Sequence, residues 1–161
     1  MESAHDRRTF LTLCAGSAIA MVAARAQAVP AITPLRLSDA DWRQRLSPAA
    51  YAVLRRGGTE RAFSSPLNGE HRAGTFVCAG CALPLFASAT KFDSGTGWPS
   101  FYDHLPRAIT GRRDMSLGMV RTEVRCARCD GHLGHVFDDG PRPTGLRYCM
   151  NGVALRFVAR A

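Results

Sequence analysis

The chain has a single lysine, Lys91, although Lys and Arg together number 21 against 13 Asp and Glu. Arginine in place of lysine, beside abundant alanine, is more typical of a codon bias than of a surface built to bind nucleic acid. Low-complexity segments are absent, as is any internal repeat beyond two paired-cysteine motifs. The 161 residues exclude a multidomain enzyme and a barrel of about 250 residues. A hydrophobic content of 46% excludes global disorder, so we expect one globular domain with a tail.

The apolar run of residues 11–24 falls short of the roughly 20 apolar residues that span a bilayer. Arg7 and Arg8 precede the run, and small residues around Arg25 and Gln27 suit a signal peptidase. Paired arginines in this place resemble a twin-arginine export signal, with a Sec signal or an uncleaved anchor as the alternatives. We predict an export signal over residues 1–28, a linker over 29–37 and one domain over 38–161.

Export places the mature protein in the periplasm, with no stable membrane association once the signal is cleaved. The signal would carry away three arginines, two acids and Cys14. The remainder has 18 basic and 11 acidic residues, a net charge of +7, and five cysteines. We expect this charge to say little about partners, and we expect a monomer that binds no nucleic acid.

Two short helices are predicted at the start of the domain. Ser38 and the acidic residues behind it suit a helix start, and Ser47 with Pro48 suits a second one. Gly57 and Gly58 would end the second helix. From Phe63 onward helical periodicity is absent, and short apolar runs alternate with turn signals. Runs at residues 75–77, 83–86, 120–124 and 152–158 predict a small antiparallel β domain.

Four cysteines form two C-x-x-C motifs, Cys78 with Cys81 and Cys126 with Cys129, separated by 44 residues. Two such turns that face each other make a tetrahedral four-thiolate site with no open position, so we expect one structural zinc ion. The alternatives are two disulfides, which an oxidising periplasm favours, or a redox-active dithiol. Twin-arginine export supports zinc, because that route carries folded proteins.

Cys149 is the remaining cysteine of the mature chain, and an unpaired thiol in an exported protein is a candidate nucleophile. Arg147 would share its strand face, where a cation favours the thiolate. His132 and His135 offer imidazoles for proton transfer. Trp98 stands in a glycine-bounded turn that could present it to a ligand. Each of these residues also has an alternative interpretation. Cys149 could be a buried structural cysteine, the histidines could be structural or metal-binding, and Trp98 could belong to the core.

The ordered segments that carry these residues closely resemble the methionine sulfoxide reductase B family. They are Gly-Trp-Pro-Ser-Phe (97–101), Arg-Thr-Glu-Val (121–124), Gly-His-Leu-Gly-His-Val-Phe (131–137) and Arg-Tyr-Cys-Met-Asn (147–151). The paired cysteines match its zinc-containing branch, and the resemblance covers about residues 37–158. It implies a mainly β fold of two antiparallel sheets with short N-terminal helices. It also implies reduction of the R epimer of methionine sulfoxide, free or in oxidised proteins, as protein repair under oxidative stress.

The resemblance also implies roles for individual residues. The Cys149 thiolate would attack the sulfoxide sulfur and become a sulfenic acid. His135 would donate a proton to the oxygen, assisted by His132, and Asn151 would support them. Trp98 would hold the methyl group of the substrate. Phe101 and Arg147 complete the substrate-binding set.

One position departs from many members of this family, which carry a resolving cysteine in the glycine turn. This chain has Thr96 there, and its mature part has no cysteine outside the paired motifs other than Cys149. We therefore expect an external thiol or a thioredoxin-like partner to reduce the sulfenic acid. Disulfide formation with a zinc cysteine is the less favoured route, because it would dismantle the metal site.

Two other classes of protein use part of these features. A zinc-ribbon module that binds nucleic acid would use the four cysteines and the charge, but would leave Cys149, the histidines and Trp98 idle. A periplasmic thiol-disulfide oxidoreductase would need an accessible thiol of low pKa at Cys78 or Cys126, and no zinc.

Overall fold

The computed structural model describes residues 31–160, and the predicted export signal of residues 1–28 lies outside them. Helix α1 (Asp39–Arg45) is capped by Ser38, whose hydroxyl accepts the Asp41 backbone N–H at 3.2 Å. Helix α2 (Pro48–Arg56) is capped by Ser47 in the same way and ends at Gly57, which has a φ of 68°. The two predicted helices are confirmed, and local capping chemistry explains their ends.

The rest of the described chain consists of short strands joined by turns. The strands are β1 (Gly74–Cys78), β2 (Pro84–Ala87), β3 (Lys91–Phe92), β4 (Ser100–Phe101), β5 (Ile109–Asp114), β6 (Arg121–Cys126), β7 (His132–Phe137), β8 (Arg147–Met150) and β9 (Leu155–Ala159). Single 3₁₀ turns lie at η1 (Pro66–Gly69), η2 (Ser88–Thr90), η3 (Ser116–Gly118) and η4 (Gly152–Ala154).

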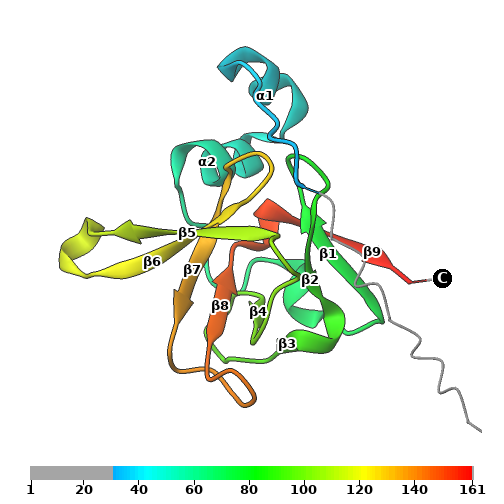
Figure 1. Cartoon of the computed structure of the whole chain (residues 1–161), viewed down its shortest axis with the longest axis vertical. Helices are drawn as coiled ribbons and strands as arrows, with labels where there is room; N and C mark the ends of the chain where they lie inside the picture. Colours follow the sequence, from blue (N-terminus) through cyan, green and yellow to red (C-terminus); the bar gives the residue numbers. More distant parts are fainter. Residues whose placement is uncertain (1–30, 161) are drawn as a thin grey trace, which may run out of the picture. The chain divides into compact units, whose positions relative to one another are not determined.

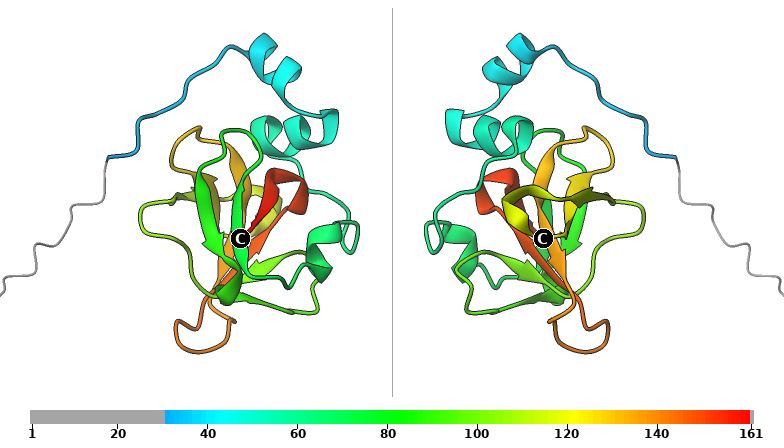
Figure 2. Two further views of the ribbon diagram at one scale, coloured as in Figure 1. Left: turned by 90° about the vertical axis from the view of Figure 1, so that its right-hand side faces the viewer. Right: turned by 90° about the vertical axis from the view of Figure 1, so that its left-hand side faces the viewer.

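The strands form two sheets in which every pair is antiparallel. The smaller sheet has the order β2-β1-β9, and the larger has the order β3-β4-β8-β7-β6-β5. Figure 1 shows the β5–β6 hairpin projecting beyond the rest of the larger sheet, and Figure 2 shows α2 above the strands. Helix α2 packs on β7 and on η4. This architecture confirms the predicted fold class.

Aromatic rings fill the space between the two sheets. Phe101 of β4 stacks on Phe86 of β2, with ring centroids 4.4 Å apart. Phe76 of β1 meets the same Phe101 ring edge-on at 4.9 Å. All three side chains are fully buried. Each therefore contributes about 2–3 kcal/mol of burial free energy, and together they hold the sheets against each other.

The last predicted strand begins later than the sequence suggests. The apolar run of residues 152–158 predicts one strand, but residues 152–154 form η4 and β9 starts at Leu155. The Glu60 carboxylate accepts the backbone N–H groups of Gly152 and, at 3.1 Å, of Val153. These donors are therefore occupied by a side chain distant in sequence and are not available to a neighbouring strand.

Candidate functional site

Cys149 lies within the larger sheet, on β8 between β4 and β7. It is paired with Ser100 of β4 and with His135 of β7. Directly opposed residues on neighbouring strands point to the same face of a sheet, so these three side chains share one face. Cys149 is half-buried, whereas the other described cysteines are buried. It is therefore the described thiol that a substrate can reach.

A cavity of about 130 Å³ opens over Cys149. Its walls combine the apolar rings of Trp98 and Phe137 with the polar groups of His135 and Asn151. Four of the predicted site residues thus come together in one place. The lining residues are Thr59, Trp98, Arg121, Gly134, His135, Phe137, Cys149, Met150 and Asn151.

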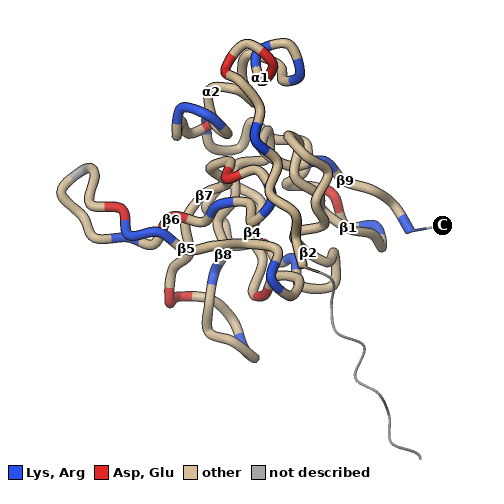
Figure 3. The backbone as a smooth tube through the Cα atoms, turned by 45° about the horizontal axis from the view of Figure 1, so that its top comes forward, with Lys and Arg blue, Asp and Glu red and all other residues tan. Residues whose placement is uncertain are grey.

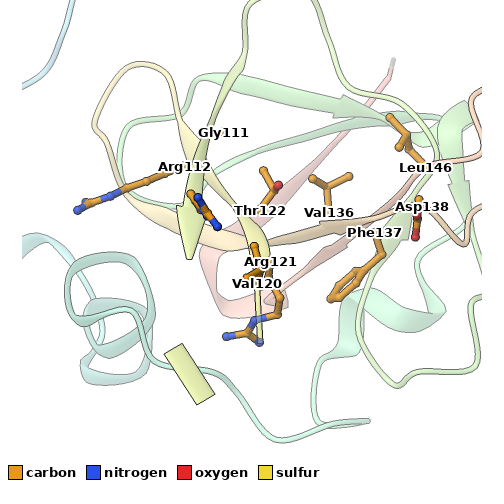
Figure 4. A pocket seen from close by; sticks show the side chains of 10 residues that line it. Gly111, Arg112, Val120, Arg121, Thr122, Val136, Phe137, Asp138 and Leu146 are labelled. Atoms are coloured by element: carbon orange, nitrogen blue, oxygen red, sulfur yellow. The ribbon is translucent and has the colours of Figure 1, made fainter. Parts of the chain in front are cut away.

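A larger hollow, of about 710 Å³, lies beside the β5–β6 hairpin (Figure 4). Thr122 and Val136 are paired across β6 and β7, and their side chains extend to the opposite side from those of Arg121 and Phe137. Alternation along β7 puts His135 on the side of Phe137. Cys149 does not line this hollow. The smaller cavity, which Cys149 lines, is therefore the candidate active site, although the other hollow is larger.

Asp114, at the end of β5, holds the imidazole of His135. Its Oδ2 lies 2.8 Å from His135 Nε2 and accepts a hydrogen bond from the Arg121 guanidinium at 2.7 Å. Hydrogen bonds from the Ser116 backbone and side chain, and from His135, keep the pKa of Asp114 well below its ordinary value. An ionised carboxylate can only accept, so His135 Nε2 carries the hydrogen. The contact thereby sets the tautomer and the orientation of His135.

His132 is held by a different carboxylate. Its Nδ1 lies 2.7 Å from Glu123 Oε1, and the Arg125 guanidinium donates to the same oxygen at 2.8 Å. Burial lowers the pKa of His132 from its ordinary value, with Glu123 opposing the shift. His132 is therefore neutral at pH 7. Its ring centroid lies 5.5 Å from that of His135, but His132 itself does not line the cavity.

Glu60 links Asn151 to Trp98. The Glu60 backbone N–H donates to Asn151 Oδ1 at 2.9 Å, and the Trp98 indole N–H donates to the Glu60 carbonyl at 3.2 Å. Asn151 also donates from Nδ2 to the Leu133 carbonyl at 3.0 Å. The segment around Glu60 therefore fixes two walls of the cavity at once.

Arg147 and Phe101 do not line the cavity. Arg147 is buried, forms two hydrogen bonds of 2.8 Å with Asp139, and lies over the Phe137 ring at 4.4 Å. The Asp139 contact raises the pKa of Arg147 further. Phe101 belongs to the aromatic core described above. As substrate-binding residues both stay predictions. Phe137, over which Arg147 lies, does line the cavity.

Thr96 occupies the position beside the nucleophile. Its hydroxyl oxygen lies 3.8 Å from Cys149 Sγ and 2.8 Å from the Ser94 hydroxyl. Ser94 is in turn 2.7 Å from Ser100. A chain of hydroxyls therefore stands beside the Cys149 thiol.

The residues that sequence reasoning missed are the partners of the histidines and of Asn151. Glu123 and Arg121 stand in a segment that carried the resemblance, yet neither was given a role. Asp114 and Glu60 lie in no motif. Their contacts depend on pairing across the β5–β6 hairpin and on a contact between residues 60 and 151, which local patterns do not encode.

The four paired cysteines form one buried cluster. Their sulfur atoms all lie within 4.8 Å of one another, with Cys78 3.6 Å from Cys129 and Cys81 3.5 Å from Cys126. A tetrahedral ion with Zn–S bonds of about 2.3 Å would separate its ligands by about 3.8 Å. Hydrogen bonding with the Cys126 thiol raises the pKa of Cys78 and lowers that of Cys81, because the sulfurs share protons. The donor set and its spacing fit a four-thiolate metal site.

The SelR domain family matches residues 46–159. A peptide methionine sulfoxide reductase MsrB of Agrobacterium fabrum is 57% identical over 121 residues, which cover 74% of this chain and 90% of that protein. The protein of that name from Pseudomonas putida is 60% identical over 121 residues, 74% of this chain and 91% of its own length. The one from Bradyrhizobium diazoefficiens is 59% identical over 120 residues, 74% and 86% of the two chains. This chain therefore belongs to the SelR-domain family of MsrB-type peptide methionine sulfoxide reductases.

Proposed function

We propose that Cys149 carries out the peptide methionine sulfoxide reductase reaction of this family on the R epimer. The Cys149 thiolate attacks the sulfoxide sulfur, and the sulfoxide oxygen passes to the cysteine. Methionine leaves and Cys149 becomes a sulfenic acid, so that the substrate gains the two electrons that the cysteine loses. The observation that carries the proposal is the half-buried Cys149, which lines one cavity together with Trp98 and His135.

The walls of the cavity suit the parts of the substrate. An indole face offers apolar surface to the methyl group. The imidazolium form of His135, whose Nε2–H is held by Asp114, offers its Nδ1 proton to the departing oxygen. His135 is oriented through Nε2 by Asp114, and neutral His132 lies beside it in contact with Glu123. A cavity with one apolar and one polar wall receives the two epimers differently. This asymmetry supports selection of the R epimer.

Turnover on the separated epimers tests the proposal. The protein should reduce a peptide with R-methionine sulfoxide in the presence of a dithiol and leave the S epimer unchanged. Cys149→Ser should lose at least about 10³-fold in kcat/KM, because hydroxyl is a far weaker nucleophile than thiolate. Retention of the thermal midpoint would show that the variant is folded. Substantial turnover by Cys149→Ser on the R epimer would refute Cys149 as the nucleophile.

An external thiol regenerates the enzyme in this scheme. A hydroxyl stands beside Cys149 in place of a resolving thiol, and the other described cysteines are buried within the metal cluster. Dithiol or a thioredoxin-like protein should support many turnovers. Without either one, methionine should form once per enzyme and then stop.

The four-cysteine cluster binds one zinc ion in our proposal, and its role is structural. All four sulfurs are ligands, so no position remains for substrate or water. The near absence of exposure at Cys78 and Cys126 argues against the alternative of a reactive C-x-x-C dithiol. Metal analysis of the purified protein should give one zinc per chain, and a value near zero would refute the site.

The site of action we propose is the periplasm, reached by the twin-arginine route. The proposal depends on the sequence of residues 1–28, which lie outside the described part. Within residues 31–160 no helix combines the length and apolar character needed to cross a membrane. Replacement of both Arg7 and Arg8 by lysine should stop export of the folded protein. Unchanged periplasmic activity would overturn this route.

Oxidised proteins are the partners that the proposal assigns, and nucleic acid is not among them. Figure 3 shows Lys and Arg at separated places on the helices, on β5 and β6 and near the end of β9, without one continuous stripe. Several of these arginines are paired with carboxylates, as Arg121 is with Asp114 and Arg147 with Asp139. We expect no salt-dependent shift of bare DNA and a monomer in solution.

A further inference from the structure

Phe63 stands in an unusual conformation beside the active site. It is 73% exposed, although it is a large apolar residue. Its φ is 63°, in the left-handed region that bulky side chains rarely adopt. Three other described non-glycine residues share positive φ, and Phe63 is the aromatic one among them. An outlier of this kind needs a surrounding structure that enforces it and frequently marks a functional surface.

The glycine turn next to Trp98 enforces this conformation. The Phe63 backbone N–H donates to the Gly97 carbonyl at 2.7 Å, and the Asn68 side chain donates to the same oxygen at 3.0 Å. The Phe63 ring lies over Gly97 so closely that a Cβ on that glycine would stand 2.7 Å from it. Gly97 itself has a φ of 89°. The ring is thus held in solvent by contacts that also set the turn carrying Trp98.

Phe63 lines a second cavity that adjoins the first. This cavity has a volume of about 270 Å³, and Phe92, Trp98 and Pro99 line it with Phe63. Trp98 also lines the cavity over Cys149. Trp98 therefore borders both cavities, and the second cavity adjoins the active site. The three aromatic residues form the apolar part of this cavity, which suits an apolar side chain. Its polar part is lined by Asn68, His71, Lys91 and Asp93.

We propose that this cavity, the Phe63 cavity, binds an apolar side chain of the oxidised polypeptide within two residues of the methionine sulfoxide. The inference rests on the proposed function, which places the sulfoxide against Cys149 and Trp98. An extended chain advances about 3.3 Å per residue, so a residue one or two positions away reaches the adjoining cavity that Trp98 also borders. The ligand is thus the polypeptide around the sulfoxide, and free methionine sulfoxide leaves the cavity empty.

Kinetics with matched R-epimer substrates test this cavity. The substrates are N-acetyl methionine sulfoxide, a peptide with glycine on both sides of the sulfoxide, and peptides with leucine at each of the neighbouring positions in turn. We expect one of the leucine peptides to have the highest kcat/KM for the unaltered protein. In Phe63→Ala the ratio of its kcat/KM to that of N-acetyl methionine sulfoxide should fall about tenfold, because apolar surface is no longer buried on binding.

Two variants separate binding from folding. Phe63→Tyr keeps the ring and should keep the ratio within about twofold. Val158→Ala removes exposed apolar surface from β9 and should also leave the ratio unchanged. An unchanged ratio in Phe63→Ala, or an equal fall for all substrates, would overturn the cavity as a binding site. Failure of the unaltered protein on every R substrate would instead refute the proposed function.

Discussion

Thr96 stands where the sequence resemblance leads us to expect a resolving cysteine, and its hydroxyl lies 3.8 Å from Cys149 Sγ. Thr96→Cys should therefore form a disulfide between position 96 and Cys149 after one turnover, since a small shift brings two sulfurs to the bonding distance of about 2.05 Å. Non-reducing peptide mapping measures this bond, with Thr96→Ser as the control that cannot form it. Persistence of the sulfenic acid in Thr96→Cys would contradict the placement of Thr96.

His132 makes stability depend on pH in a defined direction. Burial lowers its pKa in the folded protein from the ordinary value of 6.5. Between 6.5 and the folded value, the unfolded chain binds more protons than the native one, so stability falls as pH drops through this window. His132→Gln should reduce the slope of the unfolding free energy against pH by at most about 1.4 kcal/mol per pH unit. Urea unfolding between pH 7 and 5 measures it, with the exposed His71→Gln as control; equal slopes would contradict the assignment.

Individual residues could be predicted from the sequence where a motif carried them. Cys149, Trp98, His135 and Asn151 do line one cavity. Asp114 and Glu60 could not be predicted, because each reaches its partner through strand pairing or a distant loop. The ring of Phe101 stacks on Phe86 in the core, and its role as a substrate-binding residue stays a prediction.

The β5–β6 hairpin is the element that brings Asp114 to His135. Asp114→Asn removes the charge while keeping the shape, so His135 loses its anionic partner and keeps at most a neutral amide acceptor. We expect kcat to fall roughly tenfold or more, with a smaller change in KM, because positioning of a proton donor acts in the chemical step. Steady-state kinetics on an R-sulfoxide peptide measure the changes in kcat and in KM separately.

Asp130→Asn is the matched control for this hairpin. Asp130 pairs with Arg125 at the other end of β6 and is exposed. The Asp130→Asn substitution should keep kcat within about twofold of the value for the unaltered protein. Equal kinetic effects of the two substitutions would contradict a specific role of Asp114 in positioning His135.

Helices proved predictable as elements, whereas strand limits did not. The helix ends depend on neighbouring residues, as at Ser38, Ser47 and Gly57. Strand limits depend on which distant group accepts each backbone N–H. The Glu60 carboxylate accepts the N–H groups of Gly152 and Val153, so β9 begins only at Leu155.

Across the whole molecule, the cysteine cluster joins the two sheets. Cys78 ends β1 of the smaller sheet, and Cys126 ends β6 of the larger one. Cys126→Ser should therefore lose zinc and lower the free energy of unfolding by about 3 kcal/mol or more, because metal binding is coupled to folding. Thermal unfolding with metal analysis checks this, and Cys149→Ser should keep both zinc and stability. A zinc-loaded Cys126→Ser protein of unchanged stability would contradict the structural role.

The mass of each cysteine peptide after one turnover tests the account most directly. The protein is mixed with one equivalent of R-methionine sulfoxide peptide, without reductant, and reactive sulfenic acid is trapped before digestion. We predict one methionine formed per chain, the sulfenic-acid trapping adduct on Cys149, and four unmodified cysteines in the metal cluster. A disulfide between Cys149 and Cys78, Cys81, Cys126 or Cys129, or an unmodified Cys149 beside reduced substrate, would contradict it.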